Sequence, residues 1–212
     1  MTANKKIDYK KEYKDLYLPK QNPVLVDVPP ITFIAIDGKG SPQGQEYQSA
    51  LQVLYSLTFA IKMSKMSGQQ PDNYFEYVVP PLEGLWWAHG QEFDVNKKQD
   101  WLWTSMIRQP EFVTQNVFDW AIKECKKKKP EIDTTKAKLI AFDEGLCVQI
   151  MHVGPYSEEP ESLACIDEFI EKNKLINDAG NIRKHHEIYL GDPRKTSPEK
   201  LRTVLRIPVK KK

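Results

Sequence analysis

Residues 31–61, ITFIAIDGKGSPQGQEYQSALQVLYSLTFAI, contain the pattern that decides the fold. The apolar, β-branched run 31–36 is typical of a strand, and the Gly- and Pro-containing run 37–42 indicates a turn. From residue 46 to residue 66 apolar side chains recur at intervals of three and four, which predicts a long amphipathic helix. This stretch therefore reads as a strand followed by a helix.

The flanking residues extend this unit. Residues 24–28 predict one more strand before it, and residues 74–79 and 82–88 predict two strands after it, joined by Pro80 and Pro81. The first half of the chain therefore predicts the order strand, helix, strand, strand.

The same order returns near the C-terminus. Residues 146–153 predict a strand, an apolar helical stripe runs from Leu163 to Ile170, and residues 185–190 and 201–207 predict two further strands. The sequence thus predicts an α+β fold of duplicated strand-helix-strand-strand modules, with antiparallel sheets and helices.

We expect a single domain with four parts. These are an N-terminal segment (1–22), a first repeat (23–90), a helical insert with a connector (91–142) and a second repeat (143–212). One predicted helix of the insert carries Trp101, Trp103, Met106 and Ile107. A second helix is expected to begin at Pro110.

Composition excludes several classes of function. The 212 residues include 31 basic and 29 acidic side chains, a net charge of +2 that favours neither nucleic acid nor a membrane surface as partner. Cys125, Cys147 and Cys165 form no CxxC pair, which argues against a disulfide framework or a zinc knuckle. Neither a signal peptide nor an apolar run of about 20 residues occurs, so we expect a cytoplasmic protein.

Two glutamates stand out as candidate site residues. Aligning the two predicted modules places Glu76 against Glu187, so that two carboxylates approach a pseudo-twofold axis on an aromatic surface. A carboxylate in an aromatic cleft is costly to desolvate and usually binds a cation, is hydrogen bonded or has a raised pKa. Glu187 is therefore the leading candidate, and a solvent-facing glutamate on an antiparallel strand is the alternative.

Histidine and glycine patterns support no cofactor. His185 and His186 are adjacent, so in a strand they diverge and cannot bind one metal together. The run 38–40 lacks the length of a phosphate loop, and no Ser or Cys lies in a nucleophile elbow. We expect no metal site, no nucleotide site and no covalent catalysis.

The stretch 82–87, LEGLWW, places two tryptophans on opposite faces of its strand. Read as the closing strand of the first repeat, it predicts that Trp87, which shares a face with Glu83, looks toward a ligand cleft while Trp86 packs under helices. Trp101 and Trp103 are either further stacking surface or core.

Several of these motifs together resemble one family. They are HVGPY (152–156), EIY (187–189) followed by GDP (191–193), DGKG (37–40) and LEGLWW (82–87). Over residues 8–209 the chain resembles the GyrI-like small-molecule-binding domain, in its stand-alone bacterial branch, which is related to the effector domains of multidrug-sensing regulators.

The resemblance implies two modules packed as a pseudo-dimer around a ligand cleft. It implies that Glu187, with Tyr189 two residues on, faces cationic aromatic ligands. Some stand-alone relatives are hydrolases that open the cyclopropane ring of DNA-alkylating natural products. No helix-turn-helix pattern occurs in the sequence, so DNA binding is not expected.

Three functions stay open at this stage. The first is a binding protein for amphipathic aromatic or cationic compounds, a monomer in which Glu187, Tyr189, Tyr156 and the tryptophans contact the ligand. The second is a ring-opening hydrolase in which Glu187 activates water and the Tyr156 hydroxyl polarises the electrophile. The third is an interaction protein that modulates a macromolecule such as gyrase.

Overall fold

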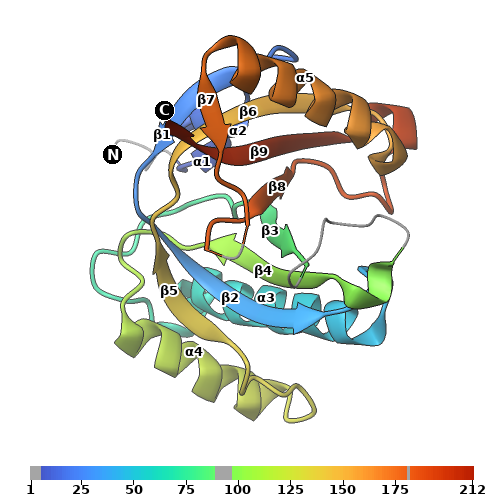
Figure 1. Cartoon of the computed structure of the whole chain (residues 1–212). Helices are drawn as coiled ribbons and strands as arrows, with labels where there is room; N and C mark the ends of the chain where they lie inside the picture. The colour runs from blue at the N-terminus through green and yellow to red at the C-terminus, as the bar shows by residue number, and fades with distance from the viewer. Residues whose placement is uncertain (1–5, 89–96, 181) are drawn as a thin grey trace.

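The computed structural model describes residues 6–88, 97–180 and 182–212 of the chain. These residues form an antiparallel sheet of nine strands with five α-helices packed around it, so the predicted α+β class is confirmed (Figure 1). The strand order across the sheet is β1-β6-β9-β8-β3-β4-β2-β5, and β7 pairs with β9 beside this path.

The elements have the following bounds in the described residues. The strands are β1 Val24–Val28, β2 Ile31–Lys39, β3 Leu82–Trp87, β4 Leu102–Arg108, β5 Lys138–Phe142, β6 Gly145–Val153, β7 Leu175–Asn177, β8 His185–Tyr189 and β9 Arg202–Lys211. The α-helices are α1 Tyr9–Glu12, α2 Lys14–Tyr17, α3 Gln45–Lys62, α4 Gln115–Lys128 and α5 Glu159–Lys172. The short 3-10 helices are η1 Ser64–Ser67, η2 Lys98–Asp100, η3 Tyr156–Glu158 and η4 Pro198–Lys200.

The order strand, helix, strand, strand occurs twice along the chain. The first group is β2, α3, β3 and β4, and the second is β6, α5, β8 and β9 with the short β7 between α5 and β8. The two groups meet where β3 pairs with β8, in the middle of the sheet. That the groups arose by duplication stays a prediction.

Helix α3 forms where the sequence predicts it. Its apolar positions recur every three or four residues and are buried against the sheet: Tyr47, Ala50, Leu54, Leu57 and Ile61. The helix ends at Lys62, and a 3-10 turn continues the chain to Gly68, whose φ of 68° suits a residue without a Cβ.

Helices α3 and α5 cover the same face of the sheet, which we name the helix face. Tyr47 of α3 stacks on Trp86, with ring centroids 5.7 Å apart. Ser162 of α5 lies 3.0 Å from Nδ1 of His152 in β6. Because opposite residues of antiparallel neighbours point to one side, the register places His152, Tyr189 and Trp86 on this face.

The N-terminal residues cover the other face, which we name the N-terminal face. The Arg206 guanidinium donates from Nη2 to the Leu16 carbonyl oxygen at 2.9 Å, and the Tyr17 hydroxyl donates to Glu83 at 3.1 Å. Both faces of the central strands are therefore buried.

This double burial explains a wrong prediction. Residues 102–108, expected to belong to a helical insert, form β4. Trp103 and Met106, on opposite faces of β4, are both 0% exposed. A strand buried on both faces carries apolar residues at adjacent positions, which hides the period of two and imitates a helical stripe.

The rest of the insert also differs in its bounds. Helix α4 begins at Gln115 instead of Pro110, and Thr114 caps it by accepting the Val117 N–H at 3.4 Å. The connector contains β5, which pairs with β2. Residues 91–96 of the expected insert lie outside the described residues.

The first repeat has a different hairpin from the predicted one. Residues 74–79 form no strand, although Tyr77 makes an isolated bridge with Ile7. LEGLWW is β3, the third element of its group, and β4 closes the group. The counterpart of LEGLWW is therefore β8 and not residues 201–207.

No helix in the described ranges is both long and apolar enough to cross a membrane.

Candidate functional site

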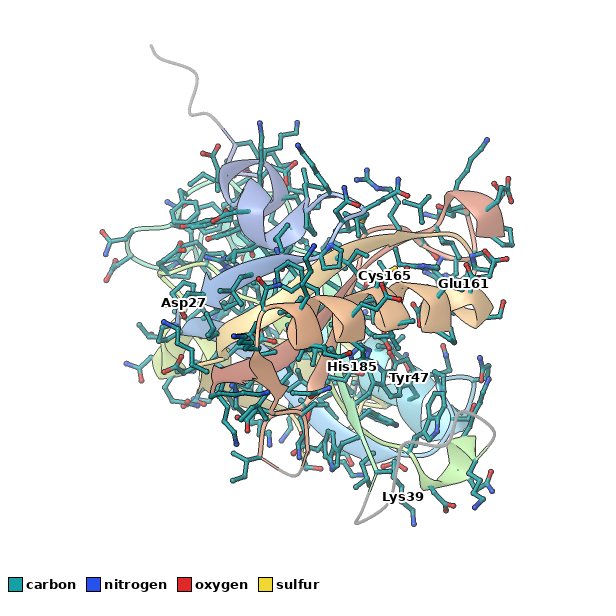
Figure 2. All side chains as sticks on the ribbon, turned by 45° about the horizontal axis from the view of Figure 1, so that its top comes forward. Asp27, Lys39, Tyr47, Glu161, Cys165 and His185 are labelled. Carbon is teal, nitrogen blue, oxygen red and sulfur yellow. The ribbon has the colours of Figure 1, made fainter. Side chains whose placement is uncertain are left out.

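The candidate site lies on the helix face of the β3–β8 pair, where the two groups of elements meet. Gly84 lies directly opposite Glu187, and Trp86 lies opposite His185. Figure 2 shows Tyr47 of α3 and His185 of β8 below the ribbon of α5. Side chains from both groups therefore meet at one place.

Glu187 is held by side chains of its own strand and of β3. Its Oε2 accepts a hydrogen bond from the Tyr189 hydroxyl at 2.6 Å, and its Oε1 lies 3.1 Å from His185 Nε2. The Tyr189 hydroxyl in turn accepts the Trp86 indole N–H at 2.9 Å. Burial and the Glu187 charge raise the pKa of Tyr189 well above its usual value, so the phenol remains a donor.

Aromatic rings surround this hydrogen-bonded chain. Trp86 stacks on Tyr47 and meets Trp101 edge-on at a centroid distance of 5.7 Å. Tyr156 meets Tyr189 edge-on at 6.1 Å and is 40% exposed, so it lies at the rim. Burial raises the pKa of Tyr47 and of Tyr156 to about 12, which keeps both hydroxyls protonated at neutral pH.

Gly84 permits the contact between the indole and the phenol. A Cβ at this position would lie 2.9 Å from Trp86 Nε1 and 3.2 Å from the Tyr189 hydroxyl oxygen. A glycine in a strand often marks such a close approach.

A second carboxyl group belongs to the site, and the sequence reasoning missed it. Glu159 is the first residue of α5, and its buried Oε1 has no hydrogen-bond partner among the described residues. Burial and, secondly, the charge of Glu187 raise the pKa of Glu159 to about 9. The available signal was the acidic helix start beside Pro160, directly after the turn that carries Tyr156.

The N-terminal face of the same strands carries a buried charged cluster, which we name the ionic cluster: Glu83, Glu144, His186 and Arg206. His186 Nε2 lies 3.0 Å from Glu83 Oε2, and His186 Nδ1 lies 3.0 Å from Glu144 Oε1. Arg206 Nη1 donates to Glu144 Oε2 at 2.7 Å. With both ring nitrogens facing carboxylates, His186 is an imidazolium, and the two cations balance the two anions.

The pKa values in the ionic cluster follow from this geometry. Burial lowers the pKa of His186, but the Glu144 charge and the contacts with Glu144 and Glu83 raise it to about 9. Burial raises the pKa of Glu144, but His186 and Arg206 lower it to about 2. All four side chains are at most 5% exposed.

Of the two adjacent tryptophans, Trp86 lies where the sequence predicts and Trp87 does not. Trp86 packs under α3, as expected, but that face also carries Glu187, so Trp86 is the tryptophan that joins the site. Trp87 lies on the N-terminal face, with the Lys184 ammonium 4.5 Å from its ring centroid. The prediction failed because it placed helices and ligand on opposite faces of β3.

Glu76 lies far from Glu187. Its carboxylate pairs with Lys62 at 2.7 Å and with Lys65, and hydrogen bonds from these two lysines lower its pKa to about 2. Lys62 ends α3, whereas Tyr47 beside the site lies in its first turn, a separation of about 22 Å along the helix at 1.5 Å per residue. The predicted match failed because residues 74–79 form no strand.

Of the other two predicted aromatic residues, one lies at the edge of the candidate site and one lies in the hydrophobic core. Trp101 is half-buried and contacts Trp86. Trp103 is fully buried, meets Tyr47 edge-on at 5.0 Å and covers Gly38, so it supports the site from within the core.

The described residues contain no group of three or more His, Cys, Asp or Glu side chains arranged to hold a metal ion.

A family model for the GyrI-like small molecule binding domain matches residues 21–210. The chain belongs to the GyrI-like family. No curated protein matches this GyrI-like chain.

Several solved GyrI-like structures resemble it over nearly its whole length. An uncharacterized conserved protein from Listeria innocua is 54% identical, with a TM-score of 0.94, and the match covers 97% of this chain and 100% of that chain. A hydrolase from Listeria innocua is 52% identical with a TM-score of 0.90 and the same coverage of 97% and 100%. A second hydrolase structure from this organism is 53% identical with a TM-score of 0.91, again covering 97% and 100%.

Proposed function

We propose that this GyrI-like protein is a hydrolase of small aromatic electrophiles. The observation that carries the proposal is the Glu187 carboxylate, fixed by Tyr189 and His185 inside a wall of aromatic rings. Two relatives that are 52% and 53% identical are described as hydrolases, which supports turnover. The substrate class is an aromatic or cationic amphipath with a strained ring, such as a cyclopropane.

Each side chain has a defined role in this proposal. Glu187 accepts a proton from a water molecule as that water attacks the electrophilic carbon. The bond from Trp86 to Tyr189 and from Tyr189 to Glu187 holds the carboxylate in one rotamer. Tyr156, at the rim, contacts the aromatic part of the substrate and directs its hydroxyl toward the electrophile.

The test is turnover of a cyclopropane-containing alkylating agent, followed by mass spectrometry. We expect the wild-type protein to convert many equivalents of the agent to a product that has gained one water. Glu187→Gln keeps the shape of the side chain but removes the base, so turnover should fall about 10²- to 10⁴-fold. Glu161→Gln, an exposed position on the outer side of α5, is the matched control and should turn over normally.

Binding without turnover is the second candidate. The partly exposed rings of Trp101 and Tyr156 in this aromatic wall favour planar cations, since a desolvated cation over an indole gains about 2 kcal/mol. Quenching of tryptophan fluorescence by a cationic rhodamine measures this binding. Quenching together with unchanged alkylating agent would favour a sequestering protein over a hydrolase.

A further inference from the structure

Glu159 is a second acidic group of the site, and the proposed hydrolysis, in which Glu187 is the base, assigns it no role. It enters the site from α5, while Glu187 enters from β8, so the two carboxyls come from different elements. Oε1 of Glu159 is buried and has no hydrogen-bond partner among the described residues. An ionised carboxylate in that position would lack the donors that usually stabilise a buried charge.

Glu187 has the opposite surroundings. The Tyr189 hydroxyl donates to one of its oxygens, and His185 Nε2 contacts the other. Glu187 therefore has a hydrogen-bond donor and a second polar neighbour, whereas Glu159 Oε1 has neither among the described residues. When two neighbouring carboxyls differ in this way, the pair holds one proton on the poorly solvated member.

We propose that Glu159 is the proton donor of this site, a neutral carboxylic acid that complements the ionised Glu187. The inference rests on the proposed hydrolysis. Water forms a bond to the electrophilic carbon, and its proton goes to Glu187. The ring bond breaks, its electron pair ends on the substrate oxygen, and that oxygen takes the proton of Glu159. Glu159 is then ionised and Glu187 protonated, so the charge of the pair is unchanged.

This assignment also restricts the substrate. A site with one carboxylate and one carboxylic acid carries a single negative charge, which suits an electrophile with one cationic group or none. It also requires that the bond cleavage leave an oxygen that must be protonated. Esters of strong acids, whose leaving groups depart without a proton, would gain nothing from Glu159.

Glu159 is coupled electrostatically to titratable groups of β8 and η3. Glu187 raises the pKa of Glu159 from β8, and the charge of Glu159 in turn raises the pKa of Tyr189 in β8 and of Tyr156 in η3. Asp192, in the loop after β8, adds a negative charge beside Tyr156. Burial and Glu187 both raise the pKa of Glu159, which supports a neutral side chain at neutral pH.

The first test is spectroscopic and needs no substrate. The infrared spectrum of the intact protein at neutral pH should contain the carbonyl stretch of a protonated carboxyl, and this band should be absent from Glu159→Gln and present in Glu161→Gln. The band should titrate near the pKa of about 9. A spectrum of the wild-type protein that is identical to that of Glu159→Gln would overturn the assignment.

The second test is kinetic and separates this inference from the proposed function. Glu159→Gln should lower turnover about 10²- to 10⁴-fold and remove the alkaline fall of the pH–rate profile, while rhodamine quenching is retained. Glu159→Asp should recover part of the rate. Full turnover and an unchanged alkaline limb in Glu159→Gln would overturn the donor role, and Glu187→Gln would still report on hydrolysis. Absence of turnover in the wild-type protein would instead overturn the proposed function, and with it the transfer step.

Discussion

His186 and Glu187 are neighbours in β8, yet they meet opposite surroundings on the two faces of the sheet. His186 lies in the ionic cluster, where every charge has a partner of opposite sign within 3.0 Å. Glu187 lies opposite Gly84 on the helix face, beside a second carboxyl whose Oε1 has no partner among the described residues. Strand β8 therefore carries a residue of a balanced set of charges on one face and a residue of an unbalanced set on the other.

The difference fits a structural role for the ionic cluster and the functional role that we propose for the helix face. Burying charges is tolerable when geometry and hydrogen bonds compensate the lost hydration, as in the ionic cluster. On the helix face the lost hydration of the two carboxyls is compensated only in part, because Glu159 Oε1 has no partner among the described residues. A ligand can supply the missing positive charge or proton acceptor. The ionic cluster holds the central strands together on the N-terminal face. The residues of the candidate site lie on the helix face of the same strands.

The largest expected effect on the free energy of unfolding comes from removing one charge of the ionic cluster. Glu144→Gln leaves His186 and Arg206 facing a single carboxylate, Glu83, so the folded state should lose about 3–5 kcal/mol. Urea unfolding followed by circular dichroism measures the loss. Glu161→Gln is the exposed control, and equal stability of the two variants would mean that the cluster contributes nothing.

Alkaline pH should weaken the same cluster reversibly. The pKa of His186 is raised from 6.5 to about 9 on folding, so its contribution is complete below about 6.5 and is lost as the pH rises through 9. Full loss corresponds to about 3–4 kcal/mol at about 1.4 kcal/mol per pH unit. Glu159 acts in the same direction, since its pKa is also raised on folding.

Urea unfolding in the Glu159→Gln background isolates the histidine. A free energy of unfolding that stays constant between pH 6.5 and 9 in that background would contradict an imidazolium at His186. On the acid side the pKa of Glu144 is lowered to about 2, so its contribution should persist above pH 4.5 and disappear toward pH 2.

A methyl group at Gly84 should disturb the helix face alone. Its Cβ would lie 2.9 Å from Trp86 Nε1, so Gly84→Ala should break the bond from Trp86 to Tyr189 and cost about 1–3 kcal/mol. Rhodamine quenching should weaken as well. Gly180→Ala is the control because nothing lies within 4 Å of its added Cβ, and equal behaviour of both variants would contradict the close approach.

The smallest effect should distinguish the two tryptophans. Trp86→Phe removes one hydrogen bond, worth about 1 kcal/mol, together with part of a buried ring, and should reduce both quenching and turnover. Trp87→Phe, on the N-terminal face beside Lys184, should leave both nearly unchanged. A larger loss of ligand response in Trp87→Phe would reverse the assignment of the faces.

The sequence predicted the long helix and most strands, and it singled out Glu187, whose role stays a prediction. Helix α3 and strand β6 have strong, unambiguous patterns, and the motif that contains Glu187 and Tyr189 is local. It did not predict β4, whose burial on both faces hides the strand period. Wrong bounds for the first hairpin then paired Glu187 with Glu76.

The partners of the site residues depend on contacts between distant segments. The charge of Glu187 acts on Glu159 only because α5 packs across the sheet, and no spacing within the chain encodes that proximity. Likewise Glu83, Glu144, His186 and Arg206 look like ordinary strand and loop residues in the sequence. Burial, which creates both the raised pKa values and the need for partners, is a property of the folded chain.

The most direct test of the contrast is to measure stability and turnover together for Glu187→Gln. Gln at position 187 keeps an acceptor for the Tyr189 hydroxyl but is no base, so the free energy of unfolding should change by less than about 1 kcal/mol while turnover of the cyclopropane agent falls at least about 10²-fold. A loss of stability as large as that expected for Glu144→Gln, or turnover equal to the wild-type rate, would contradict the division of the sheet into a structural and a functional face.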